Sequence, residues 1–164
     1  MVTHRAADMR LLHFGNLKTG IGRKGQPTTG GDVALHIQCP WRIEGPNGIV
    51  TGRGDLWEPS IENPKVDFDK WNYEDGNLQD RQFFELLKGK DKGTGSPLNL
   101  TDNLVVESVQ GDNQGGFRLA LSGGYVLAVF PHDSHGESWR MLTFSNEKNK
   151  HFVVSAENGR TKVS

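Results

Sequence analysis

The sequence predicts a β-rich α+β fold, in which two antiparallel meanders form a sandwich or a partly closed barrel, with one main helix near residues 77–88. Three observations lead to this fold class. Apolar and polar residues alternate over several short segments, which is typical of half-buried strands. The chain is rich in turn formers, with 21 glycines among its 164 residues. One segment, finally, combines helix start and stop signals.

We expect a single domain over residues 1–164. The first meander covers residues 7–52, an acidic segment and the helix cover residues 53–90, and the second meander covers residues 101–156. A chain of this length buries enough surface to fold without a disulfide or a structural metal.

The strands expected in the first meander span residues 9–14, 32–39, 41–44 and 49–51. Because residues two apart in a strand share a face, Leu35 and Ile37 lie on one face of the second strand and His36 on the other. Pro40 has no backbone N–H, so it marks an edge or a bulge. The run Pro46-Asn47-Gly48 predicts a turn before the last of these strands.

The helix is predicted from its two ends. Asn77 is a suitable N-cap, Asp80 stands in the first turn where the helix dipole favours an anion, and Gly89 is a suitable residue just beyond the last turn. The apolar residues expected to form its buried stripe are Phe83, Phe84, Leu86 and Leu87.

The second meander contains strands expected near residues 103–109, 116–122, 125–131, 138–144 and 151–155. Gly123-Gly124 predicts a two-residue hairpin turn. The apolar pairs that this turn would place on one face are Phe117 with Phe130, Leu119 with Ala128, and Leu121 with Val126.

Composition argues against several classes of partner. The net charge is -1, so no bulk field attracts nucleic acid or an anionic membrane, and we expect neither. No apolar run approaches the length of a membrane span. Cys39 is the single cysteine, and the first residues lack the apolar core of a signal peptide. These features predict a cytoplasmic protein.

No motif indicates catalysis, a cofactor or a metal site. Cys39 stands in an apolar strand, where a thiol usually acts as a small inert hydrophobe. His36 is three residues from Cys39 and on the opposite face, so the two do not share a metal unless Pro40 marks a bulge that brings them together. We therefore expect no catalytic residues, no metal and no cofactor, and the sequence leans away from an enzyme.

Five polar residues stand inside or at the start of expected strands, and they are His13, His36, Arg42, Arg140 and His151. A charged side chain in a strand lies on the wet face or pairs with a carboxylate, such as that of Glu44 or Asp55. The alternative is a shallow polar pocket for an anionic or planar ligand, in which arginine supplies a fork and tryptophan a flat wall.

The runs ALHIQCPWRIEGPNGIVTGRGDLWEP, GGFRLALSGGYVLAVFP, SWRMLTF and KHFVV resemble a group of small bacterial proteins known as conserved hypothetical proteins. The resemblance implies no activity, ligand or residue role. Proteins of this kind include immunity and accessory proteins encoded near toxins.

Three functional hypotheses follow from the sequence. The first is a non-catalytic module that binds a protein partner, as an immunity or accessory protein does. The second is a small-ligand binder or an enzyme that uses the five polar strand residues. The third is a self-associating structural protein, in which unpaired strand edges close a homodimer.

Overall fold

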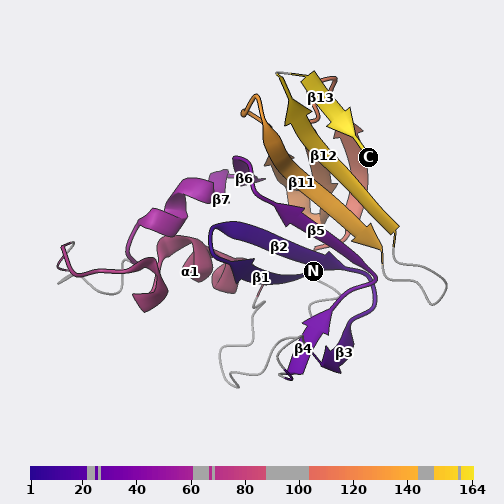
Figure 1. Ribbon diagram of the computed structural model, residues 1–164. Helices are drawn as coiled ribbons and strands as arrows, with labels where there is room; N and C mark the ends of the chain where they lie inside the picture. The colour runs from indigo at the N-terminus through magenta and orange to yellow at the C-terminus, as the bar shows by residue number, and fades with distance from the viewer. Residues whose placement is uncertain are drawn as a thin grey trace.

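The computed structural model describes residues 1–21, 25, 27–60, 67, 69–87, 104–143, 150–158 and 160–164, and Figure 1 shows their arrangement. The described strands are antiparallel throughout. The six-stranded sheet has the order β1 (Val2–Ala6), β2 (Met9–Phe14), β5 (Val33–Ile37), β11 (Gly136–Thr143), β12 (Lys150–Glu157) and β13 (Arg160–Val163). The five-stranded sheet has the order β7 (Gly48–Gly52), β6 (Trp41–Gly45), β10 (Tyr125–Val129), β9 (Phe117–Leu121) and β8 (Val106–Gly111).

The predicted fold class is confirmed, because two antiparallel sheets and one main helix form a sandwich that does not close into a barrel. Side chains from both sheets meet in one core, which includes Leu12 and Ile37 of the six-stranded sheet and Ile43 and Leu127 of the five-stranded sheet. All four are fully buried.

Each expected meander contributes strands to both sheets, so the two sheets are not the two meanders. The chain leaves the six-stranded sheet after β5 and enters the five-stranded sheet at β6, and it returns between β10 and β11. Pro40 lies at the first crossing, where it has no N–H to extend the ladder. Its carbonyl oxygen accepts a hydrogen bond of 2.9 Å from the N–H of Phe130, at the second crossing. The two crossings therefore lie side by side.

The predicted register of the Gly123-Gly124 hairpin is wrong by one residue. Ser122–Gly124 form a three-residue 3-10 turn, η3, in which Gly123 and Gly124 both have φ of 77°. Left-handed backbone at both glycines allows this longer turn. Phe117 consequently pairs with Val129, and Leu119 pairs with Leu127. Phe130 leaves the ladder and is 40% exposed, in contrast to the expectation that it packs inside.

The strands that the sequence analysis missed are β1, β13 and the two-stranded ribbon of β3 (Lys18–Ile21) and β4 (Pro27–Gly30). The ribbon lies in a glycine-rich stretch that showed no apolar alternation. The residues of β3 and β13 are all exposed, so neither strand carries the buried face on which a sequence pattern depends.

The predicted helix is confirmed as α1 (Leu78–Leu87). Asn77 caps it, because its side-chain oxygen accepts a hydrogen bond of 2.8 Å from the N–H of Asp80. Phe83 and Leu87 are buried as expected, whereas Phe84 is 55% exposed and does not belong to the buried stripe. The expected C-terminal residue Gly89 lies outside the described residues.

A buried arginine attaches α1 to the six-stranded sheet. The side chain of Arg10 on β2 is almost fully buried, and its guanidinium lies 4.4 Å from the centre of the Phe83 ring. It donates to Asp80 at 2.8 Å and also to Gln79. Gln79 in turn donates to the carbonyl oxygen of Gly52, at the end of β7, at 2.9 Å. A charge this deeply buried is stable only with such partners.

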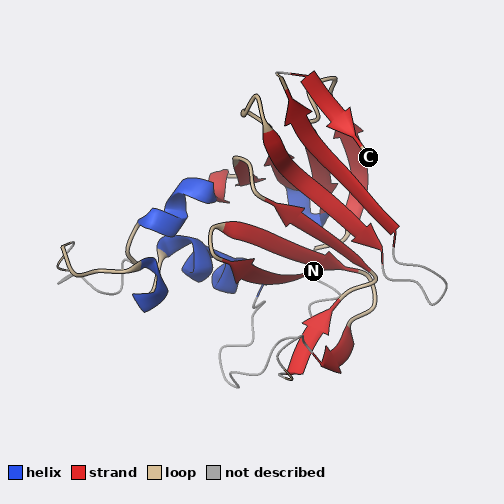
Figure 2. Ribbon diagram, in the orientation of Figure 1, coloured by secondary structure: helices blue, strands red, loops and turns tan. Residues whose placement is uncertain are grey.

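Helical segments thus fill one side of the sandwich. Figure 2 shows α1 together with the 3-10 turns η1 (Arg53–Trp57) and η2 (Tyr73–Asp75) at the side of β1, β2 and β7. The rings of Trp57 and Tyr73 meet edge to face at 5.2 Å. At this side of the molecule the gap between the two sheets is therefore closed.

Replacing the helix cap tests this arrangement. Asn77→Ala removes the acceptor for the N–H of Asp80 and the buried amide that donates to the carbonyl of Tyr73. We expect the free energy of unfolding to fall by about 1–2 kcal/mol. Urea unfolding measures the change, and Glu85→Ala, at an exposed position of the same helix, should cost no more than a few tenths of this. Equal effects of the two variants would contradict the capping role.

The change in the free energy of unfolding at acid pH tests the Arg10–Asp80 pair. Burial raises the pKa of Asp80, but hydrogen bonds from Arg10 and Asn77 outweigh burial and lower the pKa below its ordinary value. The folded state therefore gains stability from this carboxylate above about pH 4, the ordinary pKa, and loses it as pH falls through the lower folded value. Asp80→Asn should reduce stability near neutral pH and make stability depend less on pH in the acid range. Urea unfolding midpoints at several pH values measure both changes. Glu85→Gln is the control for the loss of one negative charge. If Asp80→Asn kept the acid pH dependence of the wild-type protein, the pairing would be refuted.

Candidate functional site

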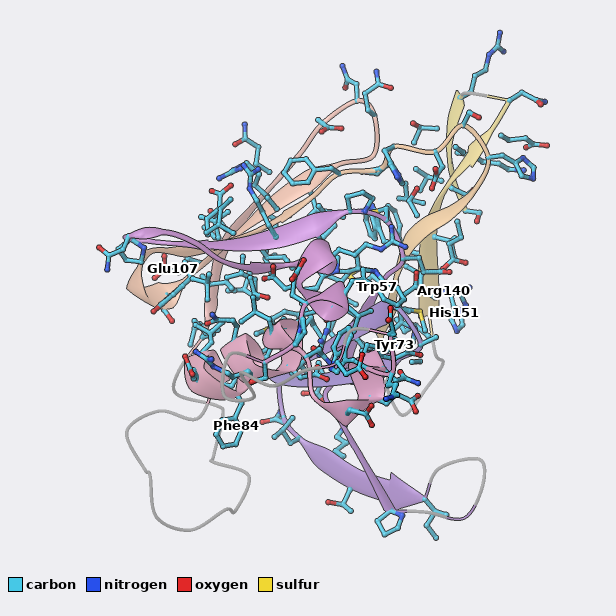
Figure 3. All side chains as sticks on the ribbon, turned by 90° about the vertical axis from the view of Figure 1, so that its left-hand side faces the viewer. Trp57, Tyr73, Phe84, Glu107, Arg140 and His151 are labelled. Atoms are coloured by element: carbon cyan, nitrogen blue, oxygen red, sulfur yellow. The ribbon has the colours of Figure 1, made fainter. Side chains whose placement is uncertain are left out.

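Four of the five predicted polar site residues share the outer face of the six-stranded sheet. His13 is on β2, His36 on β5, Arg140 on β11 and His151 on β12. Arg140 pairs across the ladder with His36, and the rings of His13 and His36 are 6.5 Å apart. Figure 3 shows Arg140 and His151 next to each other at this face.

The permanent charge of this cluster, that of Arg140, is already paired within the protein. Arg140 donates to both carboxylate oxygens of Glu137, one of them at 2.6 Å, and Gln38 donates to the same carboxylate at 2.7 Å. Burial lowers the pKa of His36, and the positive charge of Arg140 lowers it further. His13 is buried, and its Nδ1 accepts a hydrogen bond of 3.3 Å from the N–H of Gly31. An anion at this face would have to displace Glu137.

Arg42 lies apart from the other four residues, on β6 of the five-stranded sheet. It donates to Glu44 at 2.8 Å, and Arg118 donates to the other oxygen of the same carboxylate at 2.5 Å. These hydrogen bonds, led by that of Arg118, lower the pKa of Glu44. Arg42 therefore pairs with the carboxylate of Glu44, which is one of the two arrangements that the sequence predicted for this arginine.

Cys39 has the environment of a structural thiol. It is buried and free, and burial raises its pKa to about 11. Such a thiol is almost entirely protonated at neutral pH, so it is a poor nucleophile and a poor metal ligand. Among the described residues, no group of three or more His, Cys, Asp and Glu side chains could hold a metal ion.

A large apolar hollow lies between the two sheets, at the side opposite α1, and we call it the inter-sheet cleft. Its volume is about 470 Å³. Twelve of the lining residues are apolar, three are glycines and one is charged. The cleft is lined by Phe14, Val33, Leu35, Val106, Val109, Gly111, Asp112, Gly115, Gly116, Phe117, Leu119, Trp139, Met141, Phe152, Val154 and Val163.

Three aromatic rings line the inter-sheet cleft, two from the six-stranded sheet and one from the five-stranded sheet. Trp139 stands between Phe117, at 4.9 Å edge to face, and Phe152, at 5.6 Å and tilted by 32°. The indole N–H of Trp139 donates to the carbonyl oxygen of Gly115 at 2.7 Å, which holds the ring in place. This part of the lining is thus apolar and aromatic, and the polar atom of Trp139 is already bonded.

Exposed apolar residues of the edge strands β8 and β13 line the cleft, and we call this part of the lining its mouth. Every residue of β8 is exposed, and Val109 reaches 64% exposure although its side chain lines the cleft. Val163 on β13 is likewise exposed. Large apolar side chains gathered at an opening between strands are unusual for a free surface and are typical of a binding site.

A bulge in β8 gives the cleft two valines instead of one. The register shifts between Val106 and Ser108, so Val106 faces Leu121 and Val109 faces Leu119. Strict alternation would place Val106 and Val109, which are three residues apart, on opposite faces. With the bulge, both point into the cleft.

The inter-sheet cleft carries almost no charge. Asp112 is the charged residue of the lining, and its Oδ1 accepts hydrogen bonds from the N–H groups of Gln114, at 2.7 Å, and Gly116, at 2.9 Å. No lysine, arginine or histidine among the described residues lines it. The wall therefore offers shape and apolar surface, and no partner for a charged group.

Sequence reasoning missed the cleft as a site. It placed Phe117 and Leu119 on a buried face, which is correct, but it assigned no role to Trp139, Met141 or Phe152. The available signal was the apolar content of β8 and β12, whose exposure depends on the position of these strands near the sheet edges. That position is a property of the strand order.

Comparison of the chain with protein-family models, with curated proteins and with solved structures finds no match. Within the described part of the chain, no helix has both the length and the apolar character needed to cross a membrane.

Thiol reactivity tests the assignment of Cys39 as structural. A pKa of about 11 leaves the native protein with roughly two hundred times less thiolate at about pH 8 than a cysteine of ordinary pKa. We expect the native protein to react with a disulfide reagent at least a hundredfold more slowly than the urea-unfolded chain, measured by absorbance. A native rate equal to that of free cysteine would show that Cys39 is an activated thiol.

Proposed function

We propose that this protein is a non-catalytic binding module that holds a small, uncharged, apolar molecule in the inter-sheet cleft. The observation that carries this proposal is a cleft of about 470 Å³ lined almost wholly by apolar side chains from both sheets. Ligand sites in proteins are typically concave, mostly apolar and about 300–1,000 Å³ in volume.

The energetics support a ligand in this position. Met141, Phe152, Val106 and Val109 all leave apolar surface in water. Covering such surface stabilises the complex by roughly 25 cal/mol for each Å² removed from water. The Trp139 ring adds to this, because little side-chain entropy is lost when a ligand packs against a ring that a hydrogen bond already holds.

The lining also supports an uncharged ligand. A carboxylate or phosphate inside the cleft would leave water without gaining a cationic partner, and it would lie near the negative charge of Asp112. Burying an unpaired charge is strongly unfavourable. A ligand with an alcohol, ester or hydrocarbon character avoids this penalty.

The polar groups outside the cleft support a non-catalytic role. The Cys39 thiol has a high pKa and Arg140 is bonded to Glu137, so neither is available as it stands for nucleophilic or electrophilic chemistry. The buried free thiol also supports a reducing, cytoplasmic setting for the protein.

A protein partner is the second candidate, and the observation in its favour is the edge strand β8. Its outer backbone groups have no neighbouring strand within the described residues, and Val106 and Val109 stand beside them. A strand of another protein, or of a second copy, could extend the sheet there and insert apolar side chains in the cleft. This candidate includes the immunity-like and homodimeric hypotheses.

Titration with the uncharged fluorescent probe N-phenyl-naphthylamine tests the proposed function. We expect binding to the wild-type protein with enhanced probe fluorescence and energy transfer from Trp139. Val109→Glu places a charge at the mouth and should weaken binding about tenfold or more, equivalent to about 1.4 kcal/mol.

Ile49→Glu is the matched control. Ile49 is an equally exposed apolar residue on the other edge of the same sheet, and it does not line the cleft. Binding should be unchanged in this variant. Failure of the probe to bind, or equal weakening by both substitutions, would refute the proposed function. Dimers seen by light scattering and abolished by Val109→Glu would instead establish the edge-strand candidate.

A further inference from the structure

A second hollow adjoins the inter-sheet cleft. Its volume is about 410 Å³, and its lining includes Gly15, Asn16, Leu104 and Val105. Phe14 and Val106 line both this hollow and the cleft, so these two residues stand at the junction. We call the pair Phe14 and Val106 the junction pair.

The junction pair stands between the two hollows, with one residue from each sheet. Phe14 projects from β2 of the six-stranded sheet, and Val106 from β8 of the five-stranded sheet. Facing sheets in a sandwich are only about 10 Å apart, so one aromatic and one branched side chain from opposite sheets nearly bridge the space. The apolar cleft therefore ends at this pair.

The second hollow differs from the cleft in polarity. Asn16 lies in its wall and donates to Asp32 through both its backbone N–H and its side-chain amide, each at 2.9 Å. Lys18 also bonds this carboxylate, at 2.8 Å. Beyond the junction an apolar ligand would meet the polar side chain of Asn16 as well as the apolar Leu104 and Val105.

Building on the proposed function, we infer that the ligand is a single unbranched hydrocarbon chain with an uncharged head, and that the junction pair sets the chain length that the cleft accepts. The chain lies in the slot between the sheets, with its end at Phe14 and Val106. Its head remains at the mouth between β8 and β13, where no buried counter-charge is needed. Shortening either junction residue joins the two hollows and admits a longer chain.

Displacement of N-phenyl-naphthylamine by straight-chain primary alcohols, from hexanol to tetradecanol, tests this inference. In the wild-type protein the affinity should rise about fourfold for each added methylene, equivalent to about 0.8 kcal/mol, and then level off when the chain reaches the junction. Phe14→Ala and Val106→Ala should move the plateau to alcohols longer by about two methylenes or more.

Phe152→Ala is the control variant. Phe152 lines the same cleft from β12, three strands away from β2 in the sheet order. This substitution should lower the affinity for every alcohol by a similar factor and leave the plateau at the same chain length. Because Val106 is partly exposed, Val106→Ala retains the fold even if Phe14→Ala does not, and near-ultraviolet circular dichroism monitors both.

The outcomes separate the two claims. If no alcohol and no probe binds, the proposed function is wrong. If alcohols bind but the plateau stays fixed in every folded junction variant, the proposed function stands and the length-setting role is wrong. Cyclododecanol should bind at least tenfold more weakly than dodecanol, and equal affinity would refute an unbranched chain as the ligand.

Discussion

Two crossings of the chain hold the sandwich together, and the hydrogen bond from Phe130 to Pro40 joins them at 2.9 Å. Between β5 and β6, and again between β10 and β11, the chain passes from one sheet to the other at the same end of neighbouring strands. The middle of each sheet is therefore tied to the middle of the other. Within the described residues the chain makes no further crossing between the sheets, so the outer strands on either side are held by side-chain contacts alone.

The two sides of the sandwich meet this constraint differently. On one side, α1 enters the gap, and Phe83 packs against Trp41 at 5.6 Å while Arg10 is held by Gln79 and Asp80. On the other side, the described residues include no helix, and the inter-sheet cleft remains between β8 and β13. An apolar ligand in the cleft would take the place that α1 occupies on the filled side. The same physical need, to cover the inner faces of the sheets, thus accounts for both the fold and the proposed function.

How far the sequence predicts this molecule depends on the range of each interaction. The cap at Asn77 and the alternation of Leu35 and Ile37 are local, so the helix and the strand were predictable. The glycines of η3 permit turns of either two or three residues, so the register of the hairpin between β9 and β10 was not predictable. The cleft depends on the strand order and on the bulge that turns Val109 inward, and neither has a local signal. For the same reason, the separation of Arg42 from the other polar strand residues emerges only with the two sheets.

Nuclear Overhauser effects between bound dodecanol and the protein show whether the sandwich is open between its sheets. An open sandwich gives contacts from the alkyl chain to the methyl groups of Met141, Val109 and Leu119, and none to Ile43, which lies in the closed part of the core. Contacts confined to exposed residues outside the cleft, or direct contacts between the methyl groups of Leu35 and Val109 with no alcohol between them, would contradict it.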